Sequence, residues 1–256
     1  MKVRNADDSC MKLARIVPGM IMLCHVVLAA PPSHELPKHL AGVVYARGTS
    51  IVLFFFERKA VRDGDTIRVL RTFTAPDGKL AARERVTFVD GKLAAFQLDE
   101  LQTDAQGNTR VSPAAKDKSK LDFDYAVGRA KKKTGSETAE GEVIVGDMIP
   151  YFLVAHWDEL MRGQPAKFRF IVQERLETVG FKLVKESEVD WRGKRAVRIR
   201  MEPTSIIIAQ LVDPLFFIVE KESPHRVLMY DGRTTPKIRH GKSWKDLDAV
   251  TIYDWE

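Results

Sequence analysis

Turn signals at short, regular intervals constrain the fold of this chain more than any other sequence feature. Each signal contains a glycine, which accepts the positive φ that tight hairpin loops require. They occur at Asp63-Gly64, Asp77-Gly78, Asp90-Gly91, Gly107-Asn108, Arg192-Gly193 and Asp231-Gly232. The runs between them are short and rich in apolar and β-branched residues, which predicts antiparallel strands. We therefore expect a mainly β protein, in which one domain over 42–238 forms a large antiparallel meander, as a curved sheet or an unclosed β-barrel.

The expected strands differ in how many of their faces are apolar. They lie near 42–46, 51–58, 65–74, 82–89, 93–102, 121–127, 141–145, 166–177, 181–190, 195–202, 205–212, 215–221 and 226–231. Where apolar residues alternate with polar ones, as around Val86 and Phe88, one face is expected to meet solvent. The runs 51–56, 206–208 and 215–219 are apolar on both faces, so they need cover on both sides.

One mid-chain helix is expected at about 148–162. Apolar and aromatic residues recur there at steps of three and four and would form one stripe: Ile149, Phe152, Leu153, His156, Trp157 and Leu160. Asp147 is placed to cap the start of this helix, and Gly163 to end it. The polar segments 103–120 and 128–140 are expected to be long loops, and 239–256 a C-terminal tail.

The first thirty residues have the order of a secretory signal. A basic start leads into an uncharged run from Ile16 to Ala30, which ends in small residues. This run is shorter than the roughly 20 apolar residues of a membrane-spanning helix. We predict a cleaved signal peptide over 1–30, a flexible lead-in over 31–41 and a periplasmic or secreted protein; an uncleaved anchor is the alternative.

Cleavage would leave the mature chain without cysteine, because Cys10 and Cys24 are the two cysteines of the sequence. The mature protein could then form no disulfide and use no cysteine nucleophile. No metal ligand set and no cofactor are predicted. His34 and His39 resemble a zinc-protease pair, but they are five residues apart instead of four, and Pro37 breaks any helix between them.

The net charge of +6 at first suggests an anionic partner. Basic and aromatic residues alternate at 167–170, and Arg195, Arg198 and Arg200 follow on a later strand. Such a pattern is used by nucleic-acid grooves, but an exported protein meets little nucleic acid. We therefore expect no nucleic-acid partner and interpret these cations as candidates for an anionic lipid headgroup.

The layout of the chain resembles a known kind of envelope protein. A signal sequence and a long meander are followed by one helix from Ile149 to Arg162 with Gly163 after it, and then by strands that close on Tyr230-Asp231-Gly232. This order resembles uncharacterised periplasmic proteins of a bacterial domain-of-unknown-function family. These in turn look like the lipoprotein carriers of the Lol system, whose unclosed β-barrel is covered by helices and holds acyl chains. The resemblance implies a similar fold for 40–238.

We expect an envelope protein that binds or carries a lipid or another apolar ligand in a concave sheet. The residues expected to line the site lie on the doubly apolar strands and the helix stripe: Phe54, Phe56, Phe216, Ile218, Phe152, His156 and Trp157. In a plain core the same residues would simply pack together. The alternative function is a structural or assembly protein that binds an envelope partner through a sheet edge or through 54–56.

No catalytic residue is predicted, so the protein is not expected to be an enzyme. No Gly-x-Ser-x-Gly, phosphate-loop or dinucleotide motif occurs in the sequence. A hydrolase that uses His156 with Asp158 or Glu159 is a third, weaker hypothesis.

Overall fold

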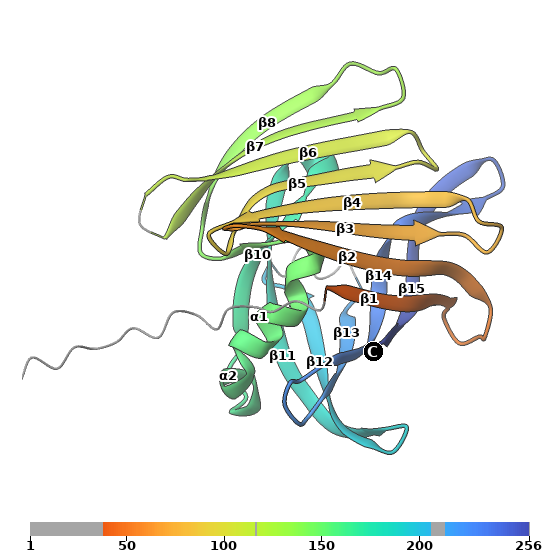
Figure 1. The fold of residues 1–256 in the computed structure, drawn as a ribbon, viewed down its shortest axis with the longest axis vertical. Helices are drawn as coiled ribbons and strands as arrows, with labels where there is room; N and C mark the ends of the chain where they lie inside the picture. The colour runs from red at the N-terminus through yellow and green to blue at the C-terminus, as the bar shows by residue number, and fades with distance from the viewer. Residues whose placement is uncertain (1–37, 116, 206–212, 256) are drawn as a thin grey trace, which may run out of the picture. The chain divides into compact units, whose positions relative to one another are not determined.

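Fifteen strands form one sheet in the computed structural model, which describes residues 38–115, 117–205 and 213–255 (Figure 1). The strands lie in the order β8-β7-β6-β5-β4-β3-β2-β1-β15-β14-β13-β12-β11-β10-β9. All neighbours are antiparallel except β9 and β10. The sheet curls into a nearly closed barrel that leaves one seam unsealed between its two edges. The prediction of a mainly β fold with an unclosed barrel is therefore confirmed.

Each strand is joined to the next along the chain mostly by a short turn. The strands are β1 (His39–Ala46), β2 (Val52–Asp63), β3 (Thr66–Thr74), β4 (Leu80–Val89), β5 (Lys92–Glu100), β6 (Ala105–Pro113), β7 (Lys118–Val127), β8 (Lys133–Glu140), β9 (Val143–Ile144), β10 (Ala166–Val172), β11 (Glu177–Trp191), β12 (Lys194–Pro203), β13 (Leu215–Glu220), β14 (Val227–His240) and β15 (Ser243–Asp254). The signal segment 1–30, His34, most of the lead-in and all but the first residue of the expected strand at 205–212 lie outside the described residues.

The expected loops 103–120 and 128–140 are largely strands, which corrects the sequence prediction. They form β6, the start of β7, and β8, which is one of the two edge strands of the sheet. In β7 the large apolar residues lie on one face, where Leu121 and Phe123 are buried. In β8 only Ala139 is fully buried. A strand with so little apolar surface has the composition of a loop. Only its pairing with a neighbouring strand identifies it as a strand.

The segment 239–256, expected as a tail, instead ends β14 and forms β15. This strand lies in the middle of the sheet, where it pairs with β1 on one side and with β14 on the other. Leu247, Ala249 and Thr251 are buried at every second position and point to the barrel interior. Asp248, between Leu247 and Ala249, lies on the outer face, and this alternation was not recognised as a strand.

The mid-chain helix is present but is interrupted at His156. A short 3-10 turn, η1 (Gly146–Met148), leads into α1 (Ile149–Ala155), and α2 (Trp157–Met161) follows. Asp147 makes no capping hydrogen bond, contrary to the sequence prediction. Its carboxylate is buried and paired with Arg58 of β2. Figure 1 shows α1 between β1–β3 and β10–β13, so it lies within the curl of the sheet.

The seam between the two edges of the sheet is bridged by side chains. Glu137 of β8 accepts hydrogen bonds from the Thr178 backbone N–H at 2.6 Å, the Thr178 hydroxyl at 2.7 Å and Arg169 at 2.9 Å. After β10, the 3-10 turn η2 (Gln173–Arg175) turns inward and packs on β6 and β7. The interior is thus covered at this end without a continuous backbone ladder.

The inner faces of the strands form several apolar clusters instead of one. One cluster packs α1 and α2 on β10–β13, and another lies among β3–β7. No helix in the described part of the chain is long and apolar enough to cross a membrane.

Candidate ligand-binding cavity

A cavity of about 330 Å³ lies between these clusters, inside the curl of the sheet. Its walls come from β2–β5, from β10–β15 and from the turns η1 and η2. The volume is within the range of about 300–1,000 Å³ that is usual for small-molecule sites. One part of the wall is apolar and includes Phe170, Phe181, Met201, Leu215 and Phe217.

The other part of the wall is polar because charged residues occupy inward positions on adjacent strands. Alternate side chains of a strand point to the same face. Arg58 of β2 lies directly opposite Arg71 of β3, which in turn lies opposite Glu84 of β4. The strand register therefore aligns two guanidinium groups and one carboxylate inside the barrel.

These charges form a buried network with Asp147 of η1. Arg58 donates to both carboxylate oxygens of Asp147, at 2.7 and 3.1 Å, and their side chains are only 4% and 1% exposed. Arg71 lies 2.5 Å from Glu84 and 3.8 Å from Asp147. From the far wall, the Thr235 hydroxyl donates to Glu84. The network ties β2, β3, β4 and β14 to the turn that starts α1.

Arg71 remains charged in this setting. Burial lowers the pKa of its guanidinium, but the carboxylates of Glu84 and Asp147 outweigh that effect and raise the pKa overall. The guanidinium also lies over the Phe56 ring, 5.2 Å from its centroid. Arg71 thus connects the ionic network to the apolar wall of the cavity.

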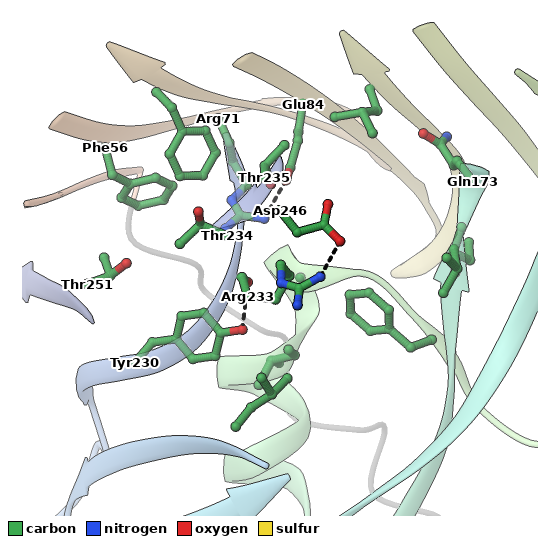
Figure 2. A pocket seen from close by; sticks show the side chains of 18 of the residues that line it. Phe56, Arg71, Glu84, Gln173, Tyr230, Arg233, Thr234, Thr235, Asp246 and Thr251 are labelled. Carbon is green, nitrogen blue, oxygen red and sulfur yellow. Dashed lines mark hydrogen bonds and ion pairs between the residues drawn. The ribbon is translucent and has the colours of Figure 1, made fainter. Parts of the chain in front are cut away.

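A second ionic group lies where β14 and β15 border the cavity (Figure 2). Lys237 Nζ is 2.6 Å from Asp246 and 3.6 Å from Glu100. Arg233 pairs with Asp246 and, at 2.8 Å, with Asp248. Burial lowers the pKa of Lys237, yet Asp246 and Glu100 raise it overall, so the ammonium group stays charged. Half of the Asp246 side chain is exposed, which places this group towards solvent.

Glu100 should make stability depend on pH. Burial raises its pKa above the ordinary 4.5, and the opposing effects of Lys237 and Thr103 do not cancel this. The folded state then binds more protons than the unfolded state, so this contribution is present at low pH and is lost as pH rises through the raised pKa. We expect the unfolding free energy of wild type, relative to Glu100→Gln, to fall as pH rises above the ordinary carboxyl pKa of 4.5 and through the raised pKa of Glu100. Urea unfolding of both proteins at several pH values measures this difference in unfolding free energy. A difference that does not change with pH would contradict the prediction.

Gln173 of η2 anchors the end of the cavity at the seam. Its Nε2 donates to the Phe96 carbonyl at 3.0 Å and to the Thr109 hydroxyl at 3.2 Å. The side chain is 4% exposed, and its Oε1 has no hydrogen-bond partner within the described residues. It lies against Gly107 of β6, where a Cβ atom would come within 2.4 Å of Oε1.

The residues predicted from the sequence to bind ligand are not brought together at the cavity, although Phe54 and Phe56 share one apolar cluster and the ring centroids of Phe152 and His156 are 4.3 Å apart. Phe56 lines the cavity, 4% exposed. The other six are not among the lining residues. Phe152 and Trp157 are packed in the cluster under β10–β13, Phe54 and Ile218 belong to two other clusters, and Phe216 lies under the guanidinium of Arg198.

His156 lies at the break between α1 and α2. Its Nδ1 is 2.9 Å from Glu159, and its Nε2 is 3.8 Å from Glu142. The side-chain contact of His156 within the helix is therefore with Glu159 and not with Asp158. Among the residues that the structure describes, no group of three or more His, Cys, Asp and Glu side chains is placed to hold a metal ion.

The cations that the sequence suggested for a lipid headgroup are on other surfaces and carry acidic partners. Arg169 binds Glu137 across the seam. Arg195, Arg198 and Arg200 pair with Glu222, Glu186 and Glu202, respectively.

The sequence reading missed the polar wall. Its signal was present in β2, where Arg58 continues the alternation of Phe54 and Phe56 on the inner face. A charged residue at such a position indicates either a buried partner or a polar cavity.

Comparisons of the chain with protein-family models, with curated proteins and with solved structures found no match. The resemblance to periplasmic carriers of the Lol type therefore stays a prediction.

Proposed function

We propose that this protein is an exported, non-catalytic envelope protein that binds or carries a small apolar or lipid ligand inside its curled sheet. The observation that supports this function best is the cavity of about 330 Å³ with a largely aromatic and aliphatic wall. Removal of an apolar ligand surface from water contributes roughly 25 cal/mol per Å². A ligand of modest size could thus bind without any catalytic or metal-binding motif.

The two walls of the cavity are suited to different parts of such a ligand. Phe181, Met201 and Phe217 offer apolar contacts, whereas Glu84, Thr235 and Lys237 lie on the polar wall. Sites of this kind obtain affinity from apolar contact and orientation from a few polar groups. The site therefore favours an elongated ligand with an apolar body and a polar end.

Filling the cavity should abolish binding. Leu98 is a partly buried lining residue of β5, and Leu98→Trp would place an indole ring in the space. We expect this variant to bind the fluorescent apolar probe N-phenyl-1-naphthylamine at least about tenfold more weakly, a change of roughly 1.4 kcal/mol. Titration of the probe against purified full-length protein measures the affinity.

Leu70→Trp is the matched control, because Leu70 of β3 is 37% exposed and lies next to the inward-facing Arg71. It should bind the probe as the wild type does, and thermal melts should show that both variants fold. Equal probe affinity of the two folded variants would refute a role of the cavity. Mass spectrometry of lipids that copurify with the wild type, and their absence from Leu98→Trp, gives a second test.

The alternative of an assembly protein has less support from the structure. Phe55 is 48% exposed, but its neighbours Phe54 and Phe56 are 7% and 4% exposed. The run 54–56 thus presents one aromatic ring to solvent and not a continuous apolar patch.

A further inference from the structure

We infer that the ligand carries an uncharged hydrogen-bonding head, such as a hydroxyl group, and not a carboxylate or phosphate. This inference rests on the proposed function and concerns the same cavity. It comes from two observations: the cations of the cavity wall are already neutralised, and two hydroxyl groups of the wall have no hydrogen-bond partner among the described residues.

Every lysine and arginine that lines the cavity is paired with acidic groups. Arg71 contacts Glu84 and Asp147, and Lys237 contacts Asp246 and Glu100. Arg233 contacts Asp246 and also Asp248. An anionic head would have to displace one of these carboxylates, and the displaced carboxylate would then lose its own partner.

The balance of charge on the wall also disfavours an anion. The lining includes Arg71, Arg233 and Lys237, but four carboxylates, those of Glu84, Glu100, Glu174 and Asp246. A charged head that leaves water without gaining an opposite charge loses several kcal/mol. A hydroxyl or carbonyl group loses much less on burial if it gains one or two hydrogen bonds.

Two hydroxyl groups on β15 can provide those hydrogen bonds. Thr251 and Tyr253 both line the cavity, and their spacing of two residues places them on the same face of the strand. Thr251 is 3% exposed. No hydrogen bond joins either hydroxyl to another residue in the described part of the chain. In Figure 2, Thr251 lies on the opposite side of the view from Gln173.

Tyr253 keeps its proton at any physiological pH. Burial raises the pKa of its phenol to about 12, although nearby Arg71 acts in the opposite direction. Its hydroxyl can therefore both donate and accept a hydrogen bond. Thr251 has the same ability, so each of the two side chains can donate a hydrogen bond to a ligand hydroxyl or accept one from it.

The test compares three ligands with the same ten-carbon chain: decan-1-ol, decanoate and decylamine. Each displaces N-phenyl-1-naphthylamine from the full-length protein at about pH 8, where decanoate is ionised. We expect decan-1-ol to bind at least about tenfold more tightly than decanoate. Tighter binding of decanoate or decylamine would overturn the inference but leave the carrier function intact. If none of the three displaces the probe, the proposed function itself fails.

Variants that remove the hydroxyl groups of β15 test where the ligand head binds. Thr251→Val removes a hydroxyl with little change of shape and should weaken decan-1-ol about two- to tenfold, as expected for one hydrogen bond. Thr72→Val, on the outer face of β3, is the matched control and should have no effect. Probe affinity should stay the same in Thr72→Val. Equal decan-1-ol affinity in Thr251→Val, Tyr253→Phe and their double variant would contradict the assignment.

Removal of a carboxylate from the cavity wall should strengthen the binding of an anionic ligand. Asp246→Asn removes the carboxylate that lies 2.6 Å from Lys237 and also pairs with Arg233. With these cations less neutralised, decanoate should bind the variant about tenfold more tightly than the wild type. An unchanged decanoate affinity would show that paired cations are not what excludes anions.

Discussion

Asp147→Ala is expected to lower the free energy of unfolding by about 3–5 kcal/mol, because it leaves a buried guanidinium without its carboxylate. Arg58 makes two hydrogen bonds to Asp147, and both side chains are almost completely buried. Arg71 loses a second, longer contact at 3.8 Å. The turn that starts α1 would also lose its tie to β2. Urea unfolding, followed by circular dichroism, measures the loss.

Asp122→Ala is the control for this prediction. Asp122 forms an ion pair with Lys120 at 3.4 Å, and about half of each side chain is exposed. Its removal should cost less than about 1 kcal/mol. Replacement of the whole buried pair, by Arg58→Met together with Asp147→Leu, should recover most of the stability. A loss of less than about 1 kcal/mol in Asp147→Ala would mean that the pair is not buried as described.

Gly107→Ala is expected to destabilise the protein by about 2–3 kcal/mol through overpacking and a strained hydrogen bond. The new Cβ would lie 2.4 Å from Gln173 Oε1 and 2.8 Å from its Cδ. Gln173 cannot move away freely, because its amide is held by the Phe96 carbonyl and Thr109. Since η2 lines the cavity, probe binding should weaken as well.

A double-mutant cycle checks the cause of this effect. In Gln173→Ala the space next to Gly107 is empty, so the added Gly107→Ala should then cost much less than it does alone. Gln106→Ala, at the exposed neighbouring position of β6, should leave stability nearly unchanged. If the cost of Gly107→Ala is the same with and without Gln173, the close contact is not the reason.

Four of the six predicted turns lie between strands, because such turns carry local information, whereas Gly107-Asn108 and Asp231-Gly232 lie inside β6 and β14. A turn such as Asp90-Gly91 places residues of positive φ between β4 and β5, and a short loop then fixes which strands pair. The strand β8 could not be predicted, because Ala139 is its only fully buried residue. The break at His156 was also invisible, since the helical spacing of apolar residues continues through it.

The cavity was beyond prediction for a different reason. The sequence marks strands that are apolar on both faces, but it does not say which of their side chains face an empty space. Phe54 and Phe56 are alike in sequence and belong to the same apolar cluster, and yet only Phe56 also lines the cavity. The buried ionic network beside the cavity depends on register: Arg58, Arg71 and Asp147 meet only when β2, β3 and η1 are assembled. No local pattern contains that information.

The order of the strands has a consequence for how the chain folds. The sheet has two arms, β1–β8 and β9–β15. Within each arm the strands pair with their neighbours in sequence, so each arm can form from short-range contacts. The contact between the two arms is different: Val43 of β1 pairs with Ile252 of β15, across most of the chain. Closing so long a loop has a large entropic cost, which slows folding. The curl around the cavity is therefore completed only when the last strand meets the first, and until then both arms expose their future interior to other chains.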